Sequence, residues 1–162
     1  MAKNITAEAV LKENYTLKEA SAIIAALAQK LTTAEKPSNM ISAYTTPDGK
    51  FLGVRVCVGG EDFVIEPHDL KDGEEMTWYE AMALLKEVGK TTWNYRQICL
   101  TMAFKDEINA LLKENGGDPL DQWYWTCAEY SAHIAFTYSG YFGSLYYYGK
   151  IRAFRCRGLL AL

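Results

Sequence analysis

The chain has few of the residues on which catalytic and metal sites usually depend. Its 162 residues include only two histidines, His68 and His133, which lie far apart in the sequence. An isolated histidine is more often a surface or hydrogen-bonded residue than a catalyst. The four cysteines form no C-x-x-C pair, and no loop has the alternating oxygen ligands of a calcium site. We therefore expect no metal and no cofactor.

Motifs that mark nucleotide binding and hydrolysis are also missing. The sequence has no G-x-x-x-x-G-K-[ST], G-x-G-x-x-G, H-E-x-x-H or G-x-S-x-G. The acidic residues Asp72, Glu74 and Glu75 precede a capped helix, where negative charge stabilises the helix N-terminus. The residues thus indicate a protein that is not an enzyme.

No apolar run approaches the roughly 18 residues of a membrane span. The first stretch, MAKNITAEAVLKENY, lacks the apolar core of a signal peptide. We therefore expect no membrane insertion, and a cytoplasmic or phage-virion location.

One basic stretch interrupts this weakly acidic chain, whose net charge is −3. Lys150, Arg152, Arg155 and Arg157 flank Phe154, a mixture that suits single-stranded nucleic acid. The rest of the chain supplies no basic groove, so a strand with one polar face is the better interpretation. We expect no nucleic-acid partner.

Residues 1–36 are predicted to be helical. Thr16 and Glu19 form a T-x-x-E capping box. A seam of apolar residues follows at 3-4-3-4 spacing: Leu17, Ala20, Ile24, Leu27 and Leu31. The seam either packs against the chain's own domain or forms a homo-oligomer.

Residues 37–162 are predicted to form strands first, then helices, then further β structure. A β-meander is predicted first, with turns at TPDG and GGED and with one strand face formed by Leu52, Val54, Val56 and Val58. A helix capped by Thr77 and Glu80 follows and ends at Gly89, and one or two more helices cover residues 96–114. WYWTCAEY resumes β character, turn-rich segments come next, and KIRAFRCRGLL forms a final strand. This order predicts an α+β fold.

The stretch from Tyr130 to Gly149 has an unusual composition. Its 20 residues contain six of the chain's 11 tyrosines and no Asp, Glu, Lys or Arg. Tyrosine offers a large, rigid contact face and a hydroxyl, and serine and glycine add adaptable small groups, as in antibody binding loops. The predicted ligand-binding residues are His133, Phe136, Tyr138, Tyr141, Phe142, Ser144, Tyr146, Tyr147 and Tyr148.

Two interpretations of these tyrosines remain open. If they bind a ligand, Tyr138, Tyr141, Tyr146 and Tyr147 should be exposed on one face. Alternatively, alternate residues such as Tyr146 and Tyr148 point into the core.

Four segments resemble, in order, a bacterial family of C-type-lectin-like domains, the Lcl C-terminal-like domains, which are close in fold to formylglycine-generating enzymes. The segments are MTWYEAMALL, DEINALLKENGGDPL, WYWTCAEYS and KIRAFR, and the match covers roughly residues 76–157. The family's W-R-L-P-T is absent, because this chain reads WNYRQIC from Trp93 to Cys99. The resemblance implies a C-type-lectin-like fold for residues 37–162.

The chain is still more similar to the variable proteins of diversity-generating retroelements. In these, adenine mutagenesis of AAC codons yields no Lys, Glu, Gln, Met or Trp, and residues 130–149 contain none of these types. The resemblance implies a variable surface that binds an unknown protein or surface glycan. The alternatives are a formylglycine-generating-type enzyme, with Cys127 and Cys156 as candidate thiols, and a structural phage or cell-surface module.

Overall fold

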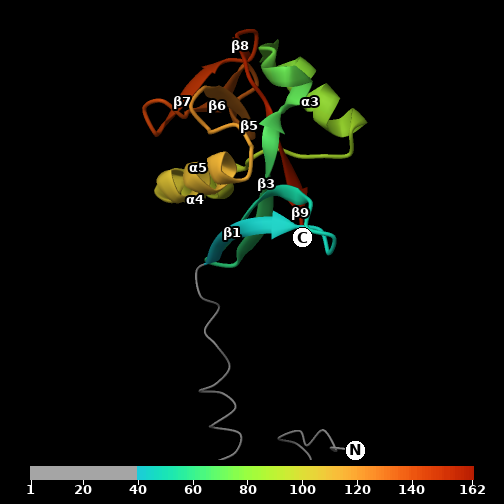
Figure 1. Cartoon of the computed structure of the whole chain (residues 1–162). Coiled ribbons are helices and arrows are strands. Elements are labelled where there is room, and N and C mark those ends of the chain that lie inside the picture. Colours follow the sequence, from blue (N-terminus) through green and yellow to red (C-terminus); the bar gives the residue numbers. More distant parts are fainter. Residues whose placement is uncertain (1–39) are drawn as a thin grey trace, which may run out of the picture. The chain divides into compact units, whose positions relative to one another are not determined.

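The computed structural model describes residues 40–162 (Figure 1). The chain divides into two units, Met1–Ser38 and Asn39–Leu162, and the second unit is described below. The predicted N-terminal helix, its capping box and the seam from Leu17 to Leu31 lie outside the described residues, as does self-association through that seam.

The described unit contains helices and strands, which confirms the α+β class. Helices α4 and α5 lie between two sheets, since α5 contacts β1 and β2 while α4 contacts β2 and β5 (Figure 1). The helical elements are η1 (Leu70–Gly73), α3 (Trp78–Glu87), α4 (Tyr95–Ala103) and α5 (Lys105–Glu114). The strands are β1 (Met40–Thr45), β2 (Phe51–Val58), β3 (Glu61–Asp69), β4 (Met76–Thr77), β5 (Trp123–Ser131), β6 (Ile134–Ser139), β7 (Ser144–Gly149), β8 (Ala153–Phe154) and β9 (Arg157–Ala161).

The first sheet has the order β1-β2-β3-β9, with antiparallel pairing throughout. The predicted meander is therefore confirmed, and the C-terminal strand returns to its edge. Val54, Val56 and Val58 are buried and Leu52 is half-buried, which agrees with the predicted period of two.

The helix predictions hold because their signals are local. At the start of α3, Thr77 Oγ1 accepts from the Glu80 N–H at 3.3 Å and the Glu80 carboxylate accepts from the Thr77 N–H at 2.8 Å. This pair forms the predicted capping box. Gly89 has a φ of 67°, a conformation that glycine adopts without strain. The segment 96–114 forms two helices that meet at Phe104.

The last part of the chain differs from the prediction. The segment expected to be turn-rich forms β6 and β7, which join β5 in an antiparallel sheet with the order β5-β6-β7, and the β5–β6 register shifts near Glu129. The single strand expected over residues 150–160 is wrong: β8 pairs with β4, and β9 joins the first sheet. The reason is that the chain turns at Lys150–Arg152 and then passes from one sheet to the other within a few residues.

The core forms two clusters. The larger lies among the first sheet, α4 and α5 and includes Trp93, Tyr124 and Tyr138. The smaller joins α3 to Trp125 and Cys156. Trp125 is fully buried, and its Nε1 donates to the Met76 carbonyl at 2.8 Å.

A buried ion pair joins β3 to β9. Arg157 is 0% exposed, and its Nε donates to Asp69 Oδ1 at 2.6 Å. Its Nη1 donates to the carbonyls of Glu66, Pro67 and Asp118 at 2.9, 3.0 and 3.2 Å. The expectation that the basic stretch forms a strand with one polar face is therefore wrong at Arg157. Its guanidinium is buried, and a carboxylate and three carbonyls take the place of water as its hydrogen-bond partners.

We predict that Asp69→Ala lowers the free energy of unfolding by about 3–5 kcal/mol, because it leaves the buried guanidinium of Arg157 without its counter-charge. Urea denaturation measures the change. The control is Asp62→Ala, which breaks the partly exposed pair with Arg55 (2.6 Å between Asp62 Oδ2 and Arg55 Nη2) and should cost less than about 1 kcal/mol. Equal losses for the two variants would contradict a special role for Asp69.

Candidate ligand-binding surface

The β6–β7 hairpin distributes its aromatic residues over two faces. In its register Phe136 lies opposite Tyr147, and Thr137 lies opposite Tyr146. Successive strand residues point to opposite sides of a sheet. Phe136 and Tyr147 therefore share one face, and Tyr146 and Tyr148 share the other.

On the first face, four rings form what we call the Tyr147 cluster: Tyr95, Tyr130, Phe136 and Tyr147. The rings of Tyr130 and Tyr147 stack with centroids 5.0 Å apart and an interplanar angle of 10°. Phe136 packs edge-on against Tyr130 at 5.9 Å and against Tyr95, at the start of α4, at 5.2 Å. Such aromatic pairs prefer these stacked and edge-to-face geometries, so the rings hold one another in place.

On the opposite face, Trp123 is the centre of what we call the Trp123 cluster: Trp123, Phe142, Tyr146, Tyr148 and Phe154. Its ring centroid lies 5.0 Å from Tyr146, 5.6 Å from Tyr148 and 5.7 Å from Phe154. Phe142 lies 6.4 Å from Trp123 and links the cluster to Tyr141 at 4.9 Å.

The exposed fractions of the tyrosines agree with the prediction in part. Tyr141 is 76% exposed, Tyr147 58% and Tyr146 36%, as a contact surface requires. The expectation that they share one face is wrong, because Tyr146 and Tyr147 are consecutive residues of a strand. Tyr148 is half-buried and packs against the smaller core cluster, so alternation toward the core holds for that residue.

The expected exposure of Tyr138 is wrong. Its side chain is 0% exposed and stacks on Tyr124 with ring centroids 6.3 Å apart, beside Trp93. Tyr138 and Phe136 lie on the same face of β6. The larger core cluster covers this face at Tyr138, whereas Phe136 is only half-buried. Tyr138 thus supports the surface from below.

The remaining predicted site residues border the clusters. Phe142 is exposed in the turn between β6 and β7, and Phe136 is half-buried within the Tyr147 cluster. His133 is exposed in the β5–β6 turn, and the half-buried Ser144 donates from Oγ to the Phe142 carbonyl at 3.3 Å.

Four members of the clusters are missing from the predicted set: Tyr95, Tyr130, Trp123 and Phe154. The register of β5 against β6 places Trp123 opposite Ser139 at the end of β6, whereas Tyr130 lies where that register shifts. Tyr95 belongs to a helix far away in the sequence, and no local pattern connects it with the hairpin.

The basic stretch is largely neutralised within the domain. The Lys150 side chain is 3% exposed, pairs with Glu129 and lies 4.2 Å from the ring centroid of Trp78. Arg155 Nη1 contacts Asp69 Oδ2 at 3.2 Å. Arg152 is exposed, and its guanidinium lies 5.8 Å from the ring centroid of Tyr148, within the range of a cation–π contact.

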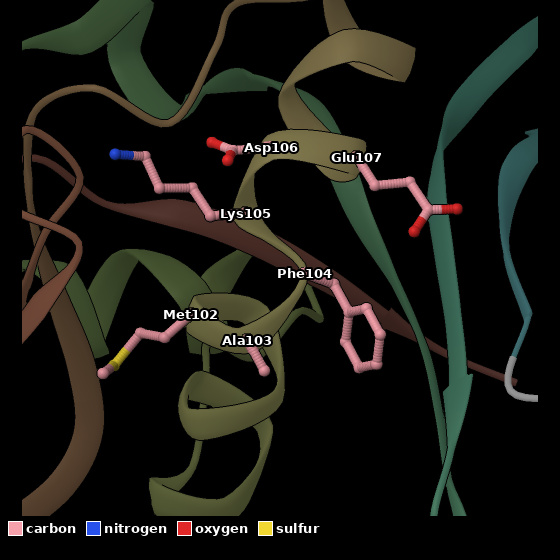
Figure 2. Close-up of a pocket in the computed structure, with 6 residues that line it drawn as sticks. All are labelled: Met102, Ala103, Phe104, Lys105, Asp106 and Glu107. Carbon is pink, nitrogen blue, oxygen red and sulfur yellow. The ribbon is translucent and has the colours of Figure 1, made fainter.

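Two open hollows lie near the hairpin. One, of about 420 Å³, lies at the α4–α5 junction and is lined by residues 102–107. Figure 2 shows Lys105 and Asp106 pointing to one side of the backbone there, and Phe104 and Glu107 to the other, so the side chains do not converge on one point. A second hollow, of about 520 Å³, places Lys105, Asp106 and Asp121 beside Tyr141.

No nucleophile–base pair or metal cage accompanies these hollows. Within residues 40–162, no three His, Cys, Asp or Glu side chains are grouped so that they hold a metal ion. In the same residues, no helix is long and apolar enough to cross a membrane.

The two thiols of the enzyme alternative are poor nucleophiles. All four cysteines are free. Burial raises the pKa of the Cys156 thiol to about 12 and also raises the pKa of the Cys127 thiol. Cys127 Sγ donates to the Trp93 carbonyl at 3.3 Å. Because the thiolate is the reactive form, these surroundings suppress cysteine chemistry at neutral pH.

No protein-family model matches this chain, and no curated protein matches it. The two aromatic clusters and the hairpin that carries them are therefore the features that bear on function.

We predict that Cys127 and Cys156 react with iodoacetamide much more slowly at pH 7 in the folded chain than in the unfolded chain, because their raised pKa values keep both thiols protonated. Mass spectrometry of timed samples gives both rates. Fast alkylation of folded Cys127 would instead indicate an activated thiolate and favour the enzyme alternative.

We also predict that Tyr138→Phe is neutral or stabilising near pH 7, because the buried Tyr138 hydroxyl has no hydrogen-bond partner. Burial raises the pKa of Tyr138 above its ordinary 10.0, so above that pH the unfolded chain releases a proton that the folded chain keeps. The free energy of unfolding of the wild type should therefore fall as pH rises past 10.0, and Tyr138→Phe should reduce this slope by up to about 1.4 kcal/mol per pH unit. Denaturation at several alkaline pH values tests this, and identical slopes would contradict it.

Proposed function

We propose that this protein is a ligand-binding protein without catalytic chemistry, whose contact surface is the β6–β7 hairpin and its turns. One observation carries the proposal: a segment free of Asp, Glu, Lys and Arg exposes Tyr141, Phe142, Tyr146 and Tyr147 outside the core. Exposed aromatic groups at this density are typical of binding surfaces. Tyrosine supplies contact area with only two side-chain torsions to immobilise.

The separation of surface from core supports this role. Trp93, Tyr124 and Tyr138 form the buried base of the hairpin, while Tyr146 and Tyr147 contribute little to either core cluster. Substitutions at such exposed positions usually change stability by no more than about 0.5 kcal/mol. The hairpin therefore accepts varied side chains without loss of the fold.

By resemblance, we propose a C-type-lectin-like scaffold of the kind found in variable proteins of diversity-generating retroelements. The four sequence landmarks and the composition of residues 130–149 support this assignment. We restrict the variable surface to the exposed positions of that stretch, because Ala135, Thr137 and Tyr138 are buried. The ligand is a protein or a surface glycan, and the raised thiol pKa values give no support to the enzyme alternative.

A library test addresses the binding role. Tyr141, Phe142, Tyr146 and Tyr147 are randomised and displayed, and binders are selected against a panel of purified proteins and glycans. The matched control randomises four exposed helix positions, Lys86, Glu87, Lys113 and Glu114. We expect binders from the hairpin library, with melting temperatures near that of the wild type. Equal yields from both libraries, or general unfolding of hairpin variants, would contradict the proposal.

The retroelement assignment has its own test in the DNA around the gene. It requires a reverse-transcriptase gene and a near-copy of the 3′ end that differs only at adenines. Their absence would reject that assignment and leave the binding role to the library experiment.

A further inference from the structure

The backbone of β7 has an outer edge that no strand among residues 40–162 covers, although the Gly149 carbonyl on that edge already accepts from the Arg152 N–H at 2.9 Å. The Lys150 N–H donates to the His133 carbonyl at 2.9 Å, just beyond the Ile134–Gly149 pair. Hydrogen-bonded and non-bonded pairs alternate along an antiparallel ladder. Tyr146 and Tyr148 therefore bond to β6, and the backbone groups of Leu145, Tyr147 and Gly149 point away from it.

The opposite edge of the same sheet is closed. The Trp125 N–H donates to the Arg155 carbonyl, and the Arg155 N–H donates to the Trp123 carbonyl, both at 2.9 Å. The Cys127 N–H donates to the Trp93 carbonyl at 2.9 Å. Within residues 40–162, no segment covers β7 in this way, and β7 lies at the outer side of its sheet (Figure 1).

The features that usually protect an open edge are missing from β7. Protein edges are commonly blocked by charged side chains, proline or a β-bulge. The sequence of β7 is SLYYYG, which has no charge and no proline, and its register with β6 runs without a shift. β1, an edge of the first sheet, has a register shift between Tyr44 and Thr45.

We propose that β7 pairs antiparallel with β7 of a second copy of this chain, about a two-fold axis at Tyr147. In this register Tyr147 faces its own copy and the two residues exchange both backbone hydrogen bonds. Leu145 then lies opposite Gly149, and Tyr146 lies opposite Tyr148. The large Leu145 therefore meets the small Gly149, and Tyr146 and Tyr148 form an aromatic cross-strand pair, which is favourable. The contact is isologous, so it closes as a dimer and does not propagate.

The charges at the ends of β7 suit a copy of the same strand. Lys150 would lie opposite Ser144, and its amine is turned inward to Glu129, so it repels nothing across the axis. Arg152 turns away from the line of β7, because its N–H donates to the Gly149 carbonyl and its guanidinium lies near the ring of Tyr148. Because β7 is neutral, pairing with itself brings no like charges together, and the self-register places Leu145 against Gly149 and Tyr146 against Tyr148, which favours a second copy as the partner.

This dimer goes beyond the proposed function and does not depend on it. Pairing uses the backbone edge, so the side chains away from the axis stay available on both faces, while Tyr147 packs beside Tyr147 of the copy. Each aromatic cluster would continue across the axis onto the copy, and two linked binding sites gain in effective concentration.

Charged side chains introduced at Tyr147, on the proposed two-fold axis, test the proposal on the full-length chain. Tyr147→Lys and Tyr147→Glu are made separately, and molecular mass is measured by sedimentation over a range of concentrations. We expect a dimer for the wild type and a monomer for each variant, because like charges would meet at the two-fold axis. A 1:1 mixture of the two variants should regain the dimer mass. Tyr147 is 58% exposed, so thermal melting should show both variants folded.

Tyr79→Glu is the control, since Tyr79 is similarly exposed but lies on α3, and its mass should equal that of the wild type. A monomeric wild type, an unchanged mass in both Tyr147 variants, or a mixture that stays monomeric would each overturn the proposal. Molecular mass and the yield of binders from the hairpin library are separate measurements, so the dimer and the binding role can fail independently.

Discussion

The carboxylate of Asp69 joins the first sheet to the short segment that lies along β5. It sits at the end of β3 and binds the buried guanidinium of Arg157 on β9 and that of Arg155 just before it. The backbone of Arg155 in turn closes the outer edge of β5. One buried charge thus fixes the short segment by which the chain leaves the second sheet and returns to the first. A charge in such a place needs counter-charges and hydrogen bonds, and Asp69 and three carbonyls supply them to Arg157, although its Nη2 has no hydrogen-bond partner among residues 40–162.

The aromatic hairpin depends on this base. β5 is fixed along one side by the Arg155 segment, β6 anchors Tyr138 in the core, and β7 lies outermost. At the far end of β7, Lys150 joins Glu129 at the end of β5 to Trp78 at the start of α3. The outer edge of β5 is therefore covered, whereas the outer edge of β7 is open. Tyr146 and Tyr147 lie on this outermost strand, beside strands that are anchored in the core.

Local signals in the sequence were sufficient for the first half of the described unit. The meander follows from the alternation of Val54, Val56 and Val58, and α3 follows from the capping box of Thr77 and Glu80. The hairpin was harder to predict, because tyrosines fill consecutive positions of β7 and hide the period of two. The aromatic composition pointed to the segment that carries most of the two clusters, but the burial of Tyr138 and the contact of Tyr95 with Phe136 come from tertiary packing. The burial of Arg157 depends on Asp69, a partner too distant in sequence for any local pattern to indicate.

The alternation of β7 has a consequence for how this chain tolerates change in its gene. Replacing Tyr146 alters the Trp123 cluster, and replacing Tyr147 alters the Tyr147 cluster, so substitutions act on one face at a time. Inserting or deleting a single residue in β7 is different, because a slip of one position carries every following side chain to the other face. The half-buried Tyr148 would then point away from the core, and the exposed ring of Tyr147 would point toward the core. We therefore expect the hairpin to accept new side chains at Tyr146 and Tyr147 more readily than a change in its length.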